Sequence, residues 1–166
     1  MRVTVVAEPL ARVCADILVA GFFEDVRPPK GLAGHVDWLT GGGLSRLIVG
    51  HRVSGRVAET ALLAVPTFST PRVLFVGLGR SSNYNYLVLH QVAEALRPVL
   101  GALQVKAAAV ELLGTQVGGL DPVIIARTFV KAWHNGSKDP GIDLTFVAPK
   151  GQQPQQLEHR LREMGM

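Results

Sequence analysis

The stretch Arg72-Val-Leu-Phe-Val-Gly-Leu-Gly79 joins an apolar run to a glycine-rich turn, and it decides the fold class of the chain. Such a continuous apolar run is typical of a strand that is buried on both faces of a sheet. Beyond the turn, apolar residues recur at intervals of three and four, as they do on one side of a helix: Leu89, Val92, Leu96 and Val99. A buried strand, a glycine turn and an amphipathic helix in this order indicate a layered α/β fold.

Five further apolar runs have the character of strands, and they lie at residues 3–7, 17–20, 61–65, 107–113 and 143–147. Further helices are predicted near Gly42, from Asp121-Pro122 to just before Gly136, and after Pro154. Asp followed by Pro is a specific start signal, because the carboxylate caps the first turn and proline fits the first helical position. The alternation predicts a three-layer α/β/α sandwich with a mixed, mostly parallel sheet of about six strands.

Length and composition fit one globular domain over residues 1–166, with a polar segment and a terminal helix at 149–166. Hydrophobic residues make up 48% of the chain and charged residues 18%, which excludes intrinsic disorder as its main state. The single cysteine, Cys14, excludes an intrachain disulfide and a cysteine-based metal cluster, and we expect it to be buried. Charged residues interrupt the apolar start, so we expect neither a signal peptide nor a membrane span, and a cytoplasmic location.

The net charge of +4 is unevenly distributed along the chain. Residues 44–106 hold seven basic side chains and only two acidic ones, Glu59 and Glu94. A positive middle third suits an anionic small ligand or an acidic partner, although solvated surface arginines would give the same composition. No dense Lys/Arg run is interleaved with aromatic residues, so nucleic acid is not an expected partner.

Three glycine-rich loops, at residues 41–43, 77–79 and 114–119, follow strand-like segments and lead towards helices. Glycine lets the backbone approach a phosphate closely, and the free N–H groups at a helix start then bind it. A phosphorylated ligand is therefore predicted to lie between the first and third loops, at these residues: Gly41, Gly42, Gly43, Gly114, Thr115, Gly118 and Gly119. The alternative for each loop is a turn that requires a positive φ angle.

Known catalytic and cofactor-binding patterns do not occur in the sequence. The five histidines share no i,i+4 spacing, and there is no Gly-x-Ser-x-Gly nucleophile motif. Ser82 stands where the dinucleotide-binding fingerprint requires its third glycine, which argues against a nicotinamide cofactor. We therefore expect no catalytic residue, no metal and no cofactor in this chain.

Three stretches, in order along the chain, resemble the N-terminal domain of the leucine aminopeptidase (cytosol aminopeptidase) family: residues 16–25, 36–47 and 72–79. The resemblance implies a macro-domain-like fold, in which a largely parallel sheet lies between helices. Residues 41–43 and 114–122 resemble the two loops through which the macro family binds ADP-ribose. Where that family has an Asn-Ala-Ala-Asn run, this chain has Gly21-Phe-Phe-Glu24, which removes contacts to the ribose.

The catalytic chemistry of the aminopeptidase family resides in a separate C-terminal domain with two metal ions. Its Asn-Thr-Asp-Ala-Glu-Gly-Arg run, which supplies metal-binding carboxylates, does not occur in this chain. The resemblance therefore implies a stand-alone, non-catalytic binding or assembly module, whose partner would be itself or an aminopeptidase catalytic domain. The alternative is a macro-like binder of ADP-ribose or a related phosphorylated nucleotide.

Overall fold

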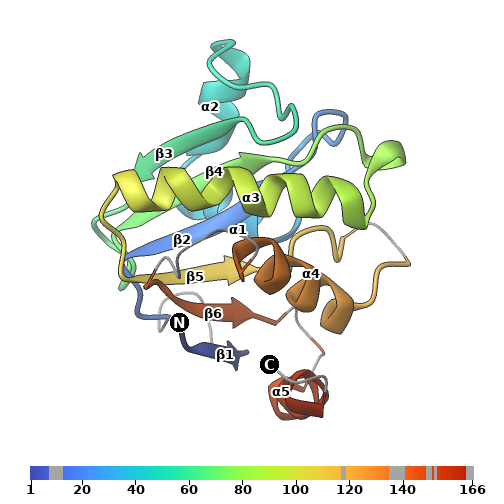
Figure 1. Cartoon of the computed structure of the whole chain (residues 1–166). Coiled ribbons are helices and arrows are strands. Elements are labelled where there is room, and N and C mark those ends of the chain that lie inside the picture. Colours follow the sequence, from blue (N-terminus) through green and yellow to red (C-terminus); the bar gives the residue numbers. More distant parts are fainter. Residues whose placement is uncertain (8–12, 117–118, 135–140, 149–150, 152, 164–166) are drawn as a thin grey trace.

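A computed structural model gives the structure of the chain, and it describes residues 1–7, 13–116, 119–134, 141–148, 151 and 153–163. The strands are β1 (Val3–Val6), β2 (Ile17–Phe22), β3 (Thr60–Ala64), β4 (Arg72–Gly77), β5 (Ala107–Glu111) and β6 (Asp143–Val147). They form one six-stranded sheet in the order β1-β6-β5-β2-β4-β3 (Figure 1). Neighbouring strands are parallel, except that β3 runs antiparallel to β4.

Helices cover both faces of this sheet, as Figure 1 shows. They are α1 (Gly31–Leu39), α2 (Gly43–Val49), α3 (Tyr86–Ala102), α4 (Pro122–His134) and α5 (Pro154–Glu163), with a short 3₁₀ turn, η2 (Ser81–Asn83), before α3. Alternate residues of β2 pack into two separate cores. Ile17 and Val19 join the core under α3, α4 and α5, whereas Leu18 and Ala20 join the core under α1 and α2. The predicted α/β fold with a mixed, mostly parallel sheet is confirmed.

Helix α1 is the element that no sequence pattern predicted. Two of its nine residues are glycines, Gly31 and Gly34, and glycine is a weak helix former. Ala33 and Val36 are fully buried in the core that α1 shares with β2. Tertiary packing therefore stabilises a helix that local propensity does not favour.

The sequence predicts that Ser82 or Asn83 caps the helix before Leu89 and that Pro98 with Gly101 ends it, and the bounds of α3 differ from this prediction. Asn85, rather than Ser82 or Asn83, caps the helix, because those two residues belong to the 3₁₀ turn. The helix also continues through Pro98 to Ala102. Leu96 and Leu100 are fully buried on either side of this proline, and their packing holds the helix against the sheet.

Cys14 is exposed, so the expectation of a buried thiol is wrong. It lies before β2 begins at Ile17 and therefore outside the sheet, while its neighbour Val13 takes the buried position. The described residues include no helix that is both long enough and apolar enough to cross a membrane.

The sheet has one position from which the chain leaves neighbouring parallel strands towards opposite faces. After β2 the chain enters the layer of α1 and α2, whereas after β5 it enters the layer that contains α4. Because β2 and β5 are adjacent, their carboxyl ends border the crevice where ligands bind in open α/β sheets. This position is therefore the first place to look for a site.

Candidate functional site

A buried carboxylate occupies the crevice between β2 and β5. Glu111, the last residue of β5, is only 7% exposed. Its Oε2 accepts a hydrogen bond from the Gly21 amide at 3.0 Å, and its Oε1 accepts one from the Leu32 amide at 3.1 Å. Gln116 Nε2 donates a further bond to Oε1 at 2.7 Å. Glu111 therefore ties β2, β5 and the first turn of α1 together.

The environment of Glu111 opposes its ionisation. Burial raises the pKa of this carboxyl to about 7, although the hydrogen bonds from Leu32, Gly21 and Gln116 lower it in part. Burial also raises the pKa of Tyr84, and the negative charge of Glu111 adds to that effect. The hydroxyl of Tyr84 donates to the Leu113 carbonyl at 2.9 Å. The crevice thus holds two ionisable groups that favour their neutral forms.

Apolar side chains fill the crevice next to Glu111. A Cβ atom at Gly21 would lie 2.8 Å from Leu78 Cδ1 and 2.9 Å from Leu113 Cδ2. Both leucines are almost fully buried. Gly21 therefore makes room for the protein's own leucines at the place where a ligand would enter such a fold.

The structure places Gly41 and Gly42 between α1 and α2 and makes Gly43 the first residue of α2, so the prediction that this loop follows a strand is wrong. The predicted position of the loop was wrong because the sequence pattern did not reveal helix α1, which lies between β2 and this loop. A Cβ atom at Gly43 would lie 2.7 Å from Leu63 Cδ2, and Leu63 pairs with Val73 near the amino end of β4. Gly41 and Gly42 both have positive φ angles, as the alternative of a structural turn requires.

The loop after β5 lies at the opposite, carboxyl ends of the strands. Gly114 is buried with φ +91°, and a Cβ atom there would lie 2.0 Å from the ring of Tyr84. Thr115 is half-buried, and Gly119 is exposed with φ +101° and open space around it. Gly118 lies outside the described residues. The structure therefore does not bring the two predicted loops together, and phosphate binding by either stays a prediction.

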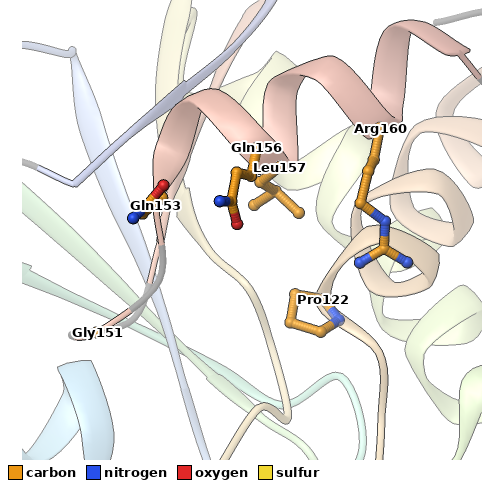
Figure 2. Close-up of a pocket in the computed structure, with 6 residues that line it drawn as sticks. All are labelled: Pro122, Gly151, Gln153, Gln156, Leu157 and Arg160. Carbon is orange, nitrogen blue, oxygen red and sulfur yellow. The ribbon is translucent and has the colours of Figure 1, made fainter.

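A cavity of about 280 Å³ lies beyond this loop, between α5 and the start of α4. Figure 2 shows Gln153 just before α5, Gln156 and Leu157 on α5, and Arg160 extending towards Pro122. The Arg160 guanidinium is 3.1 Å from the carboxylate of Asp121, which caps α4. Partial burial raises the pKa of Asp121. Hydrogen bonds from Arg160 and from two backbone amides outweigh this effect and hold the pKa below its usual value. The cation that faces this cavity is therefore already paired.

Metal binding finds no support in the described residues. In that part of the chain, no three His, Cys, Asp or Glu side chains gather as metal ligands would. The sequence places Trp133-His134 near a helix end, which predicts a packed aromatic residue beside a surface histidine, and the structure confirms this prediction. Trp133 is fully buried and donates from Nε1 to the Ala93 carbonyl at 2.8 Å, while His134 is exposed.

Glu111 is the residue that sequence reasoning missed. It stands as a lone acid inside the apolar run Ala107-Ala-Ala-Val-Glu-Leu-Leu113, which we interpret as strand. A charged residue within a strand that is buried on both faces signals a partner, because acids are almost never fully buried unpaired. That signal predicts a buried polar contact but not its partners, which come from residues 21 and 32.

Comparison with known proteins places the chain in a family. Residues 19–137 match the model of the N-terminal domain of the cytosol aminopeptidase family. A probable cytosol aminopeptidase of Buchnera aphidicola is 30% identical over 94 residues, which are 56% of this chain and 19% of that protein. The chain therefore spans about a fifth of the length of that relative.

Solved structures agree on the fold. A macrodomain of Mycobacterium tuberculosis DarG superposes with a TM-score of 0.72 at 16% identity, over 89% of this chain and 98% of that one. A tomato leucine aminopeptidase superposes with a TM-score of 0.69 at 21% identity, over 98% of this chain and 35% of that one. Both likenesses establish a macrodomain-like fold.

Proposed function

Because this chain belongs to the cytosol aminopeptidase family, as an N-terminal domain of that family, we propose that it is a non-catalytic assembly module that docks on an aminopeptidase catalytic domain. The matched domain is distinct from the one that carries the catalysis of the family. The longer relatives support the choice of partner, since the tomato enzyme has nearly two thirds of its length outside the matched region. In such an enzyme that additional chain is the natural neighbour of this domain.

The exposure of large apolar side chains on the layer of α1 and α2 carries the proposal. Trp38, in the last turn of α1, is 76% exposed and stacks on the ring of His35. Val49, at the end of α2, is 78% exposed, and Leu39 is 44% exposed. Covering apolar surface is favourable by about 25 cal/mol per Å², and tryptophan is enriched among the residues that dominate binding energy. These side chains are therefore the docking residues of the proposal.

The strand-end crevice argues against the alternative function, binding of ADP-ribose or a related nucleotide. A phosphate there would meet the side chain of Glu111, which already accepts a hydrogen bond from the Leu32 amide at the start of α1. Displacing Glu111 would leave a buried carboxylate without its hydrogen bonds. The separation of the two glycine loops points the same way, because one ligand would have to reach opposite ends of the strands.

Docking is tested by mixing the chain with the catalytic domain of a cytosol aminopeptidase and measuring the complex by analytical ultracentrifugation. We expect a complex that Trp38→Gln and Val49→Gln each weaken by about tenfold, equivalent to roughly 1.4 kcal/mol. Leu87→Gln is the matched control, because Leu87 is 77% exposed but lies on α3, on the other face of the sheet.

Three results would contradict docking on a catalytic domain. One is no complex with that domain, and another is equal weakening by Leu87→Gln. The third is association of the chain with itself that depends on Trp38, which would identify a second copy as the partner. Saturable binding of ADP-ribose to the same preparation would favour the nucleotide-binding alternative instead.

A further inference from the structure

A second cavity, of about 320 Å³, lies at the carboxyl end of β4, where the segments after β2 and β4 meet the segment before β3. Its volume falls within the range of roughly 300–1,000 Å³ that is usual for small-molecule sites. Charged and apolar side chains line it together: Glu24, Arg56, Arg80, Val57, Leu78 and Val88. None of these residues belongs to α1 or α2, so the cavity is separate from the proposed docking surface.

Glycines allow the three backbone segments to pack closely around this cavity. The Gly79 amide donates to the Gly55 carbonyl at 2.8 Å, and the Glu24 amide donates to the Gly79 carbonyl at 2.9 Å. A Cβ atom at Gly77 would lie 2.0 Å from the Arg56 carbonyl oxygen, and one at Gly55 would lie 2.9 Å from the backbone of Glu24. The backbone segments that form the walls of the cavity are therefore hydrogen-bonded directly to one another.

Two carboxylates outside the cavity hold its walls in place. Glu59 Oε2 accepts four hydrogen bonds, at 2.8 to 3.1 Å, from the backbone and one hydroxyl of residues 54–56. Asp25 accepts two from the amide and hydroxyl of Ser81, both at 2.8 Å. The bonds from Ser81 hold the pKa of Asp25 below its usual value, and the charge of Arg80 adds to this. The segments that carry Arg56, Arg80 and Glu24 are thus fixed before any ligand arrives.

The charged side chains at this cavity make no direct contact with one another, although the charge of Arg80 acts on the nearby carboxylate of Asp25. Within the described part of the chain, the guanidinium groups of Arg56 and Arg80 make no hydrogen bond or ion pair, and neither does the carboxylate of Glu24. Leu78, by contrast, is only 1% exposed and gives the cavity an apolar floor. Preformed walls, an apolar floor and unpaired charges are the features of a small-molecule site.

We propose that this cavity binds the carboxylate of an apolar α-amino acid unit, either free or at the carboxyl end of a peptide. Arg56 and Arg80 would hold the carboxylate, because a guanidinium presents paired N–H donors that match two carboxylate oxygens. The apolar side chain of the ligand would contact Val57, Leu78 and Val88. The carboxylate of Glu24 would accept a hydrogen bond from the nitrogen of the ligand. The site is independent of any docking on a catalytic domain.

The balance of charges favours a carboxylate over a phosphate. The two arginines and one glutamate that line the cavity sum to a net charge of +1, and the carboxylate of Asp25 lies close enough to interact with Arg80, so a monoanion suits this balance better than a dianion. A phosphate dianion would leave a surplus negative charge beside Glu24, and it would offer nothing to the apolar floor. In this proposal, two arginines from the positive middle of the sequence, Arg56 and Arg80, bind the carboxylate of the ligand.

Calorimetric titration of the full chain tests the proposal with four probes: N-acetyl-L-leucine, N-acetyl-L-leucinamide, L-leucine and inorganic phosphate. We expect N-acetyl-L-leucine or L-leucine to bind, and the amide, which lacks only the carboxylate, to bind at least tenfold more weakly. The tighter of the two carboxylates shows whether the ligand is a peptide end or a free amino acid. Arg56→Gln and Arg80→Gln should each weaken binding by about tenfold, since each removes a charged donor.

The control variant is Arg52→Gln, because Arg52 is exposed in the same positive stretch but does not line the cavity. It should leave binding unchanged. The proposal is overturned by equal binding of the amide, by tighter binding of phosphate, or by equal weakening in Arg52→Gln. Absence of saturable binding of either carboxylate at about 10 mM would overturn it as well.

Discussion

At the scale of single residues, Glu111 determines what the strand-end crevice is able to do. Its carboxylate accepts from two backbone amides and one side-chain amide, and so it takes the position that an anionic ligand would take. Helix N-termini favour anions because their first amides are unpaired. In this protein the group that accepts the amide at the start of α1, where an anionic ligand would bind, is a carboxyl of the chain itself.

The raised pKa of Glu111 predicts a pH dependence of stability. The carboxyl has a pKa of about 7 in the folded protein against 4.5 ordinarily, so the folded state holds its proton more tightly than the unfolded chain. The free energy of unfolding therefore falls as pH rises from 4.5 to 7, by on the order of 3 kcal/mol from this group. Glu111→Gln removes the titrating group and should remove this fall.

Urea unfolding of the wild type and of Glu111→Gln, at several pH values between 4.5 and 7, measures the difference. Tyr84→Phe is a useful control, because it removes the hydroxyl bonded to Leu113 and leaves Glu111 in place. This variant should lower stability without changing the pH dependence. Parallel pH profiles for the wild type and Glu111→Gln would show that the carboxylate ionises freely in the folded protein.

At the scale of elements, the existence of α3 follows from a local sequence pattern, whereas the residue at which it begins depends on the surrounding structure. Its apolar stripe is visible in the sequence, but its start depends on which of several polar residues caps it. Asn85 Oδ1 accepts from the amides of Leu87 and Val88 at 2.9 and 3.2 Å. Asn83, two residues earlier, lies in the 3₁₀ turn instead.

Removing the cap should therefore destabilise the protein in a position-specific way. Asn85→Ala leaves two amides of the first turn without their acceptor, and we expect a loss of about 1 kcal/mol. Asn83→Ala removes a similar exposed side chain that caps no helix, and should change stability by less than about 0.5 kcal/mol. Chemical denaturation of both variants makes the comparison. Equal losses would mean that Ser82 or Asn83 caps the helix in solution.

Strands and amphipathic helices were predictable because each depends on a short pattern. The six strands lie where continuous apolar runs place them, and α4 begins at Pro122 as Asp121-Pro122 indicates. Helix α1 could not be predicted, because Gly31 and Gly34 weaken its local helical signal. The burial of Val36 compensates for the low helix propensity through contacts with residues that are distant in the sequence. This one omission also misplaced the loop at 41–43, since a preceding helix returns the chain to the other end of the sheet.

At the scale of the whole molecule, sites depend on segments that the sequence keeps apart. Glu111 meets the Leu32 amide across 79 residues, and Arg56 faces the same cavity as Glu24 and Arg80. Composition identified the middle of the chain as positive, yet it gave no indication of which arginines share a cavity. Residue types were therefore predictable, whereas their convergence required the fold.

The terminal helix tests whether the chain is one cooperative unit, as its length predicts. Leu157 and Leu161 of α5 are buried in the same core as α3 and α4, and α5 packs against β1 and α4. Leu157→Ala should therefore lower the stability of the whole domain by about 2–5 kcal/mol while leaving one unfolding transition. Leu87→Ala, at a 77% exposed position, should change it by less than about 0.5 kcal/mol. Calorimetric unfolding in which Leu157→Ala leaves the main transition in place would instead identify α5 as an appendage that folds separately.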